Sequence, residues 1–199
     1  MEKPILFSAP MVKAILGGRK TMTRRVVDPQ FTALWGQGIR TGHEDAYSIH
    51  VNIMADDGSW KWLECPYGKP GDTLWVRETF AVNCVGGKDF VFYRADCGSD
   101  GDGAKWKPSI FMPRWASRIT LRITDVHAER LQEISEADAI AEGLIQRPDW
   151  PDVQWACVNG NYWRDPRQAF RTLWDSINEK RGYGWHDNPW VWIVSFEKV

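Results

Sequence analysis

The segment GGRKTMTRR, residues 17–25, marks the change from a helix to a strand near the start of the chain. Residues 10–15 place apolar side chains at helical spacing after an early proline, which predicts a short helix, preceded by a strand at residues 5–7. The two glycines end this helix, because glycine readily adopts the left-handed conformation found at helix ends. Residues 21–27 are rich in β-branched side chains and predict a strand.

The basic segment does not match a nucleotide-triphosphate loop. That motif needs a lysine directly after its last glycine and a helix after the lysine, so that backbone N–H groups surround the phosphates. Here Arg19 separates Gly18 from Lys20, and a strand follows. Two interpretations remain: a basic turn that compensates the dipole at a helix C-terminus, or the edge of a functional pocket.

Strand periodicity bears on the second interpretation. Successive side chains of a strand point to opposite faces, so one face receives Lys20, Met22 and Arg24 and the other receives Thr21, Thr23 and Arg25. A bulge at the strand entrance would bring Lys20 and Thr23 together. A buried lysine beside several arginines holds its proton less firmly, and it can then deprotonate a threonine hydroxyl.

The rest of the chain alternates strands with helices. Ser135 and Asp138 have the spacing of a helix cap, and apolar residues at alternate positions in 119–123 predict a half-buried strand. Further strands are expected at 73–80, 89–95 and 188–199, a hairpin at 47–63, and helices at 135–143 and 165–182. About six strands with flanking helices predict an α+β fold whose mixed sheet closes into a small β-barrel.

Length and composition predict one domain over residues 1–199, with an insertion at about 30–69. The 25 basic and 26 acidic residues leave no global positive charge, so a nucleic-acid site would have to be a local patch. Four dispersed cysteines and four histidines lack metal-ligand spacing, so we expect free thiols and no metal. No apolar run is long enough for a membrane span, which favours a cytoplasmic protein.

Tryptophan is unusually frequent, with 13 in 199 residues. Its large apolar face suits a core or a platform for stacking bases, and we expect most of these residues to belong to the core. Trp190 and Trp192 are two positions apart in a strand and should lie on one face.

Several motifs together resemble the ASCH domain, a PUA-like small β-barrel family. They are PILFS, ILGGRKTMTRR, PGDTLWVRET and LQEISEADAIAEGL, in this order. The additional stretches MPRWASRITLRITDV and NPWVWIVSFE resemble longer ASCH proteins carried by phages and prophages. The resemblance covers nearly the whole chain except residues 30–69 and about 146–163.

The resemblance implies an amidohydrolase that removes the acetyl group of N4-acetylcytidine, although the family also includes RNA-binding and RNA-cleaving members. It implies a catalytic triad of Lys20, Thr23 and Glu142, without a cofactor. Glu142 is reached by counting eight residues from Ile134. In this chain Glu142 directly precedes Gly143, in the context of a helix stop, and the chain is much longer than the minimal enzymes.

Basic and aromatic residues supply candidates for binding a modified nucleoside or RNA. The candidates are Arg19, Arg25, Arg114, Trp115 and Arg118. The alternative for the last three is a basic loop around a core tryptophan. Glu78 follows Arg77 in a strand and is expected to form a structural ion pair. The preferred function is hydrolysis of an acylated cytosine; the alternatives are a base-binding or RNA-binding module without catalysis and an RNA-cleaving protein.

Overall fold

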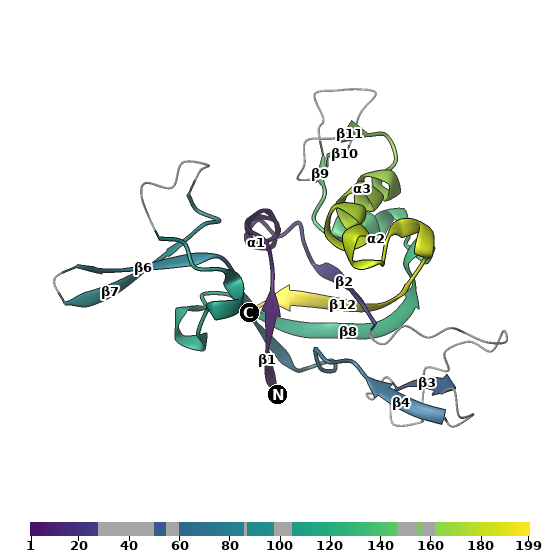
Figure 1. Ribbon diagram of the computed structural model, residues 1–199, viewed down its shortest axis with the longest axis horizontal. Helices are drawn as coiled ribbons and strands as arrows, with labels where there is room; N and C mark the ends of the chain where they lie inside the picture. Colours follow the sequence, from purple (N-terminus) through teal and green to yellow (C-terminus); the bar gives the residue numbers. More distant parts are fainter. Residues whose placement is uncertain (28–49, 55–59, 86, 98–104, 147–154, 157–161) are drawn as a thin grey trace.

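The computed structural model describes residues 1–27, 50–54, 60–85, 87–97, 105–146, 155–156 and 162–199, and these form a mixed α+β structure (Figure 1). Its α-helices are α1 (Ala9–Leu16), α2 (Glu136–Ala141) and α3 (Pro166–Asn178). Its strands are β1 (Glu2–Leu6), β2 (Met22–Val26), β3 (His50–Met54), β4 (Trp60–Glu64), β5 (Thr73–Arg77), β6 (Phe80–Val85), β7 (Lys88–Tyr93), β8 (Thr120–Arg130), β9 (Ile145–Gln146), β10 (Trp155–Ala156), β11 (Tyr162–Trp163) and β12 (Trp190–Lys198).

A five-stranded sheet forms the centre, in the order β1-β5-β8-β12-β2. β1 runs parallel to β5, whereas the other neighbours are antiparallel. The longest pairing joins β8 to β12, and its register shifts between Ser195 and Phe196. The expectation of about six strands was too low. The described residues contain twelve, and the additional ones form short sheets outside the central sheet.

The central sheet is open in the described pairings, because β1 and β2 form its two edges and do not pair with each other. One side-chain contact crosses between these edges: Arg25 Nη2 of β2 donates a hydrogen bond of 2.6 Å to the Leu6 carbonyl of β1. The α+β class expected from the sequence is observed. Closure of the central sheet into a barrel stays a prediction.

The core lies against β8 and β12. In β8, Leu121 and Ile123 are buried and the intervening Arg122 is exposed, as the sequence alternation predicts. In β12, consecutive residues from Val191 to Val194 are all buried, because both faces of this strand are covered. Trp192 is fully buried and Trp190 packs against the same core.

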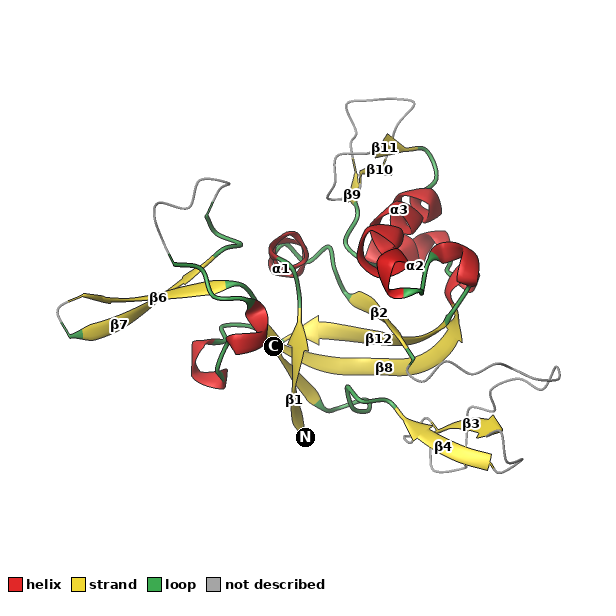
Figure 2. Cartoon of the chain, in the orientation of Figure 1, coloured by secondary structure: helices red, strands yellow, loops and turns green. Residues whose placement is uncertain are grey.

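The three α-helices lie above the central sheet in the view of Figure 2. The cap predicted for α2 is present, since the Ser135 hydroxyl accepts a hydrogen bond of 3.1 Å from the Asp138 amide. In α3, Phe170, Leu173 and Trp174 lie in the core, whereas Ile177 on the same apolar side of the helix is 55% exposed. The apolar side of α3 therefore extends beyond the core in the last helical turn.

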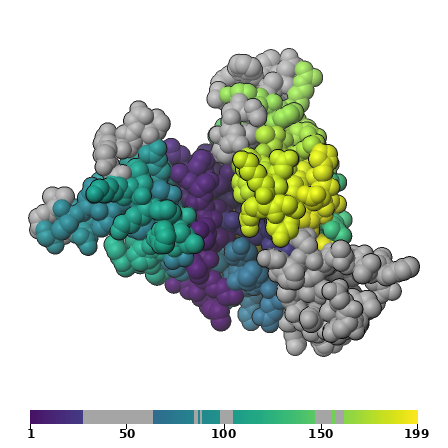
Figure 3. Space-filling view, viewed as in Figure 1, coloured from purple at the N-terminus to yellow at the C-terminus, as the bar shows by residue number. Residues whose placement is uncertain are grey.

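Hairpins extend from this body. The β6–β7 hairpin projects to one side in Figures 1 and 3, with a small separate cluster of Phe80, Met112 and Ala116 beside it. Part of the hairpin expected at 47–63 is confirmed, because β3 pairs with β4; residues 47–49 and 55–59 lie outside the described part.

Two further expectations concern thiols and membranes. Cys65, Cys84 and Cys97 are free thiols, as expected, and Cys157 lies outside the described residues. Among the described helices, none has the length and apolar character needed to cross a bilayer.

Candidate functional site

A cavity of about 530 Å³ lies between the start of α1, strand β2 and the end of α3. Its volume is in the range of small-molecule sites, which is roughly 300–1,000 Å³. Aromatic side chains contribute to its walls, namely Phe7, Tyr67, Phe170 and Trp174. The charged lining residues are Lys20, Arg24, Arg25, Glu142 and Arg181.

Lys20 enters this cavity from the junction between α1 and β2. After α1 the chain turns through Gly17 and Gly18, and the Lys20 amide donates to the Ala14 carbonyl at 3.1 Å. Lys20 then forms an isolated backbone bridge with Glu142, at the end of α2. Its side chain is only 2% exposed. Lys20 Nζ donates to Glu142 Oε2 at 2.6 Å and to the Glu142 carbonyl at 2.9 Å.

Gly143 makes this close approach possible. Its φ is +97°, a conformation that residues with a side chain rarely adopt. A Cβ atom at this position would lie 3.0 Å from the Cβ atoms of both Ala14 and Lys20. The sequence predicts only the helix stop at Gly143. The structure adds that a side chain there would collide with the base of the Lys20 side chain.

The surroundings of Lys20 lower its pKa. Burial is the largest cause, since it penalises the charged ammonium, and the positive charges of Arg25 and Arg24 act in the same direction. Glu142 opposes them by attraction and hydrogen bonding. The expected lowering is thus present, but its main cause is burial. Arg19 is not among the charges that act on Lys20.

Thr23 lines the same cavity as Lys20 and is 4% exposed. It pairs with Val194 within the sheet. Strict alternation from Lys20 would put these two side chains on opposite faces. The alternation fails because β2 begins only at Met22, while Lys20 bridges to Glu142 and the Thr21 amide donates to the Ala141 carbonyl at the end of α2. The irregular entrance brings Lys20 and Thr23 to one cavity.

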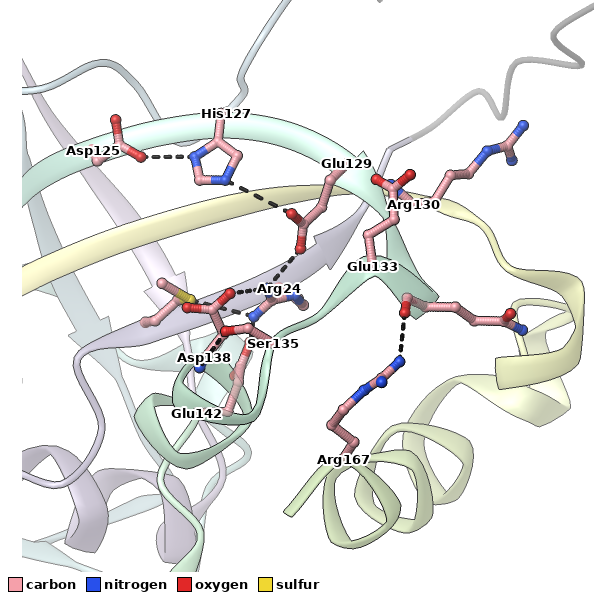
Figure 4. A network of polar contacts seen from close by, with 12 residues as sticks. Arg24, Asp125, His127, Glu129, Arg130, Glu133, Ser135, Asp138, Glu142 and Arg167 are labelled. Carbon is pink, nitrogen blue, oxygen red and sulfur yellow. Dashed lines mark hydrogen bonds and ion pairs between the residues drawn. The ribbon is translucent and has the colours of Figure 1, made fainter. Parts of the chain in front are cut away.

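Arg24 is a buried member of the site that the sequence did not reveal (Figure 4). Its side chain is 1% exposed, and Nη2 donates to Glu129 Oε1 at 2.6 Å and to Asp138 Oδ2 at 3.1 Å. Its Nη1 lies 3.6 Å from Glu142 Oε1. Arg24 therefore holds carboxylates from β8 and α2 around the Lys20–Glu142 pair. These partners are more than a hundred positions away in sequence, so local patterns could not indicate them.

The network continues from Arg24 to the surface of β8 (Figure 4). Glu129 Oε2 lies 4.0 Å from His127 Nε2, and His127 Nδ1 lies 2.7 Å from Asp125 Oδ2. Charged groups thus connect a surface histidine to the buried pair.

Some buried polar atoms of the cavity lack a hydrogen-bond partner in the described structure. They include Glu142 Oε1, Arg24 Nε and Arg25 Nε. Buried polar atoms are rarely left unsatisfied in native proteins, and these three are enclosed in the cavity wall without a direct partner in the described structure.

The remaining candidates from the sequence lie outside the cavity lining, except Arg25. Arg114 pairs with Glu2 at 2.8 Å, and Trp115 is 63% exposed, so it is not the core tryptophan of the alternative interpretation. Arg118 bonds to Glu78 and Asp96. The ion pair expected for Glu78 is confirmed.

Arg19 also lies outside the lining. Its guanidinium is instead near Gly17, where a Cβ atom would lie 2.9 Å from Arg19 Nη1. Sequence proximity to Lys20 therefore did not place this side chain in the cavity.

No family model, curated protein or solved structure matches the chain. Among the described residues, no group of three or more His, Cys, Asp or Glu side chains is arranged to hold a metal ion.

Proposed function

We propose that the protein hydrolyses the amide on the exocyclic amine of an acylated cytosine nucleoside such as N4-acetylcytidine. The observation that carries the proposal is the buried contact of 2.6 Å between Lys20 Nζ and Glu142 Oε2 in a cavity that Thr23 also lines. The resemblance to ASCH domains supports the same triad. In this proposal the open central sheet corresponds to the PUA-like barrel, with the Arg25–Leu6 contact joining its two edges.

The reaction uses Thr23 as nucleophile and Lys20 as base. Neutral Lys20 takes the hydroxyl proton while Thr23 Oγ forms a bond to the acyl carbon. The resulting ammonium returns the proton to the exocyclic nitrogen as the C–N bond breaks, which leaves an acyl-threonine and releases cytidine. Water, deprotonated by Lys20, then attacks the ester carbon, and the ammonium returns this proton to Thr23 Oγ as the ester C–O bond breaks and the carboxylic acid leaves.

Two features of the site suit these roles. Burial lowers the pKa of Lys20 and so favours the neutral amine that can act as a base. Glu142 stabilises the ammonium that forms during the reaction, and it holds Nζ through both its side chain and its carbonyl. Arg24 Nη1 lies 3.6 Å from Oε1, the other carboxylate oxygen of Glu142.

The walls suit a planar base. Phe7, Tyr67, Phe170 and Trp174 line the cavity and offer apolar surface against which a cytosine ring can pack.

The test is turnover of N4-acetylcytidine, with cytidine and acetate measured by chromatography. Lys20→Met, Glu142→Gln and the nearly isosteric Thr23→Val should each lower kcat/KM by about a hundredfold or more. Thr172→Val is the matched control, because this half-buried threonine of α3 lies outside the cavity lining and its hydroxyl donates to the Gln168 carbonyl at 3.0 Å. No hydrolysis by the unaltered protein, or a Thr23→Val variant as fast as it, contradicts the proposal.

One observation favours a base-binding module without catalysis as the second candidate. The short contact to Glu142 is an ion pair, and a lysine that keeps its proton cannot act as a base. Lys20 and Glu142 would then recognise a base edge by hydrogen bonding. Binding of N4-acetylcytidine without any product over hours, measured on the same protein sample, identifies this case.

A further inference from the structure

The charges of the cavity wall do not balance. Lys20 pairs with Glu142, and Arg24 contacts three carboxylates. Arg25 and Arg181 also line the cavity, yet within the described residues neither forms an ion pair with a carboxylate. Two arginines without a carboxylate partner among the described residues therefore line one cavity, Arg25 half-buried and Arg181 exposed.

Arg25 is held in place without being neutralised. Its Nη2 donates to the Leu6 carbonyl at 2.6 Å, and its guanidinium carbon lies 5.1 Å from the centre of the Phe7 ring. A guanidinium has five N–H donors, and the bond to the Leu6 carbonyl uses one of them. The side chain is thus oriented by neutral contacts and retains donors for an anion.

Arg181 reaches the cavity from the short helical turn Glu179–Arg181 that follows α3. Its Nη1 donates to Asn178 Oδ1 at 3.4 Å. Asn178 is itself buried and donates to the Trp174 carbonyl. The turn ends at Gly182, whose φ is +80°. Arg181 therefore also has a neutral anchor and no counter-charge among the described residues.

We propose that Arg25 and Arg181 form an anion subsite for the phosphate of a nucleotide. This inference rests on the proposed function and makes the preferred substrate an acylated cytidine monophosphate instead of the free nucleoside. Arginine suits the role because its planar donor groups match phosphate oxygens in pairs. A dianionic phosphate would balance the two free positive charges, whereas a neutral nucleoside would leave them unbalanced.

Binding measurements test the subsite without requiring catalysis. Isothermal titration calorimetry would compare cytidine 5′-monophosphate with cytidine for the unaltered protein, Arg25→Gln and Arg181→Gln. We expect the monophosphate to bind about tenfold tighter or more, as for charge-assisted hydrogen bonds, and each substitution to remove most of this preference. Inorganic phosphate should compete with the monophosphate.

Lys180→Gln is the matched control, since it removes one positive charge next to Arg181 from a side chain outside the cavity lining. It should keep the preference for the monophosphate. Arg25→Lys keeps the positive charge and serves as a second variant in case Arg25→Gln does not fold. The thermal midpoints of both variants would be compared with that of the unaltered protein. Equal affinities for cytidine and its monophosphate, or a preference retained in the Arg25→Gln, Arg181→Gln double variant, overturn the inference.

Turnover separates this inference from the proposed function. If N4-acetylcytidine and its 5′-monophosphate are hydrolysed with equal kcat/KM in all variants, the hydrolase stands and the phosphate subsite is wrong. If neither is hydrolysed but the monophosphate binds in an arginine-dependent way, the subsite stands and the hydrolase is wrong.

Discussion

Lys20 Nζ and Glu142 Oε2 lie 2.6 Å apart although the two residues are separated by 122 positions in the chain. The side-chain contact is accompanied by a backbone bridge between the same residues, so their relative position is fixed twice. The junction after α1 and the end of α2 consequently behave as one unit. Substitutions at the junction after α1 or at the end of α2 should therefore alter the cavity.

Gly143→Ala should damage the site more than its backbone strain alone implies. The new Cβ would meet Ala14 and Lys20 at 3.0 Å, in addition to the cost of about 1–2 kcal/mol for a positive φ. Gly71→Ala is the control, because Gly71 has a similar φ of +90° and open space around it. Thermal unfolding should show a larger loss for Gly143→Ala, together with reduced turnover. Equal losses would mean that the contact with Lys20 is unimportant.

Turnover of N4-acetylcytidine should rise with pH as Lys20 loses its proton. Arg25→Gln removes a positive charge that lowers the pKa of Lys20, so the rise should move to higher pH. Arg19→Gln should leave the rise nearly where it is, because Arg25 and Arg24, and not Arg19, are the arginines among the causes of the lowered pKa. A shift in Arg19→Gln but not in Arg25→Gln would contradict the geometry.

The same lysine should make stability depend on pH. Its pKa is lowered in the folded state from an ordinary value of 10.5, so between these two values the unfolded chain binds more protons. The free energy of unfolding should therefore gain a contribution that increases with pH across this window. Lys20→Met should lack that contribution. Denaturant unfolding of both proteins at several pH values measures the difference, and parallel curves would rule out a lowered pKa.

Arg24→Gln should be strongly destabilising, by about 3 kcal/mol, because removing one member of a buried charge network leaves the others unpaired. Glu142, Glu129 and Asp138 would all lose a partner. Arg122→Gln breaks an exposed pair with Glu197 and should cost less than about 1 kcal/mol. Urea unfolding compares the two, and similar values would show that the Arg24 network contributes little to stability.

Arg118→Gln should affect stability but not turnover, because Arg118 lies outside the cavity lining. Burial raises the pKa of Glu78, and the bonds from Arg118 oppose this rise. The folded state therefore already binds more protons than the unfolded chain above the ordinary value of 4.5, and stability falls there as pH rises. Without Arg118 the pKa of Glu78 should rise further, so this fall should become larger and extend to higher pH. Unfolding curves at several pH values and the rate with N4-acetylcytidine measure both effects. A large loss of turnover in a folded Arg118→Gln variant would indicate that Arg118 takes part in substrate binding.

Local patterns predicted the elements that depend on local physics. The alternation in β8, the Ser135 cap and the start of α3 at Pro166 all follow from short-range spacing. Arg24 was missed because its three partners come together only through the packing of α2 and β8 against β2. Conversely, Arg114 and Arg118 are close in sequence but bind different acidic residues, which is why their clustering suggested a shared site that the structure does not form.

The hydrogen bond from Arg25 to the Leu6 carbonyl also affects the free edge of the central sheet. In the described pairings β1 bonds only to β5, so its outer edge presents backbone groups that another chain can use as a template. The Arg25 side chain occupies one acceptor of that edge and places a positive charge beside it, which disfavours pairing with a further strand. Loss of Arg25 would therefore open an edge for intermolecular strand addition as well as altering the cavity.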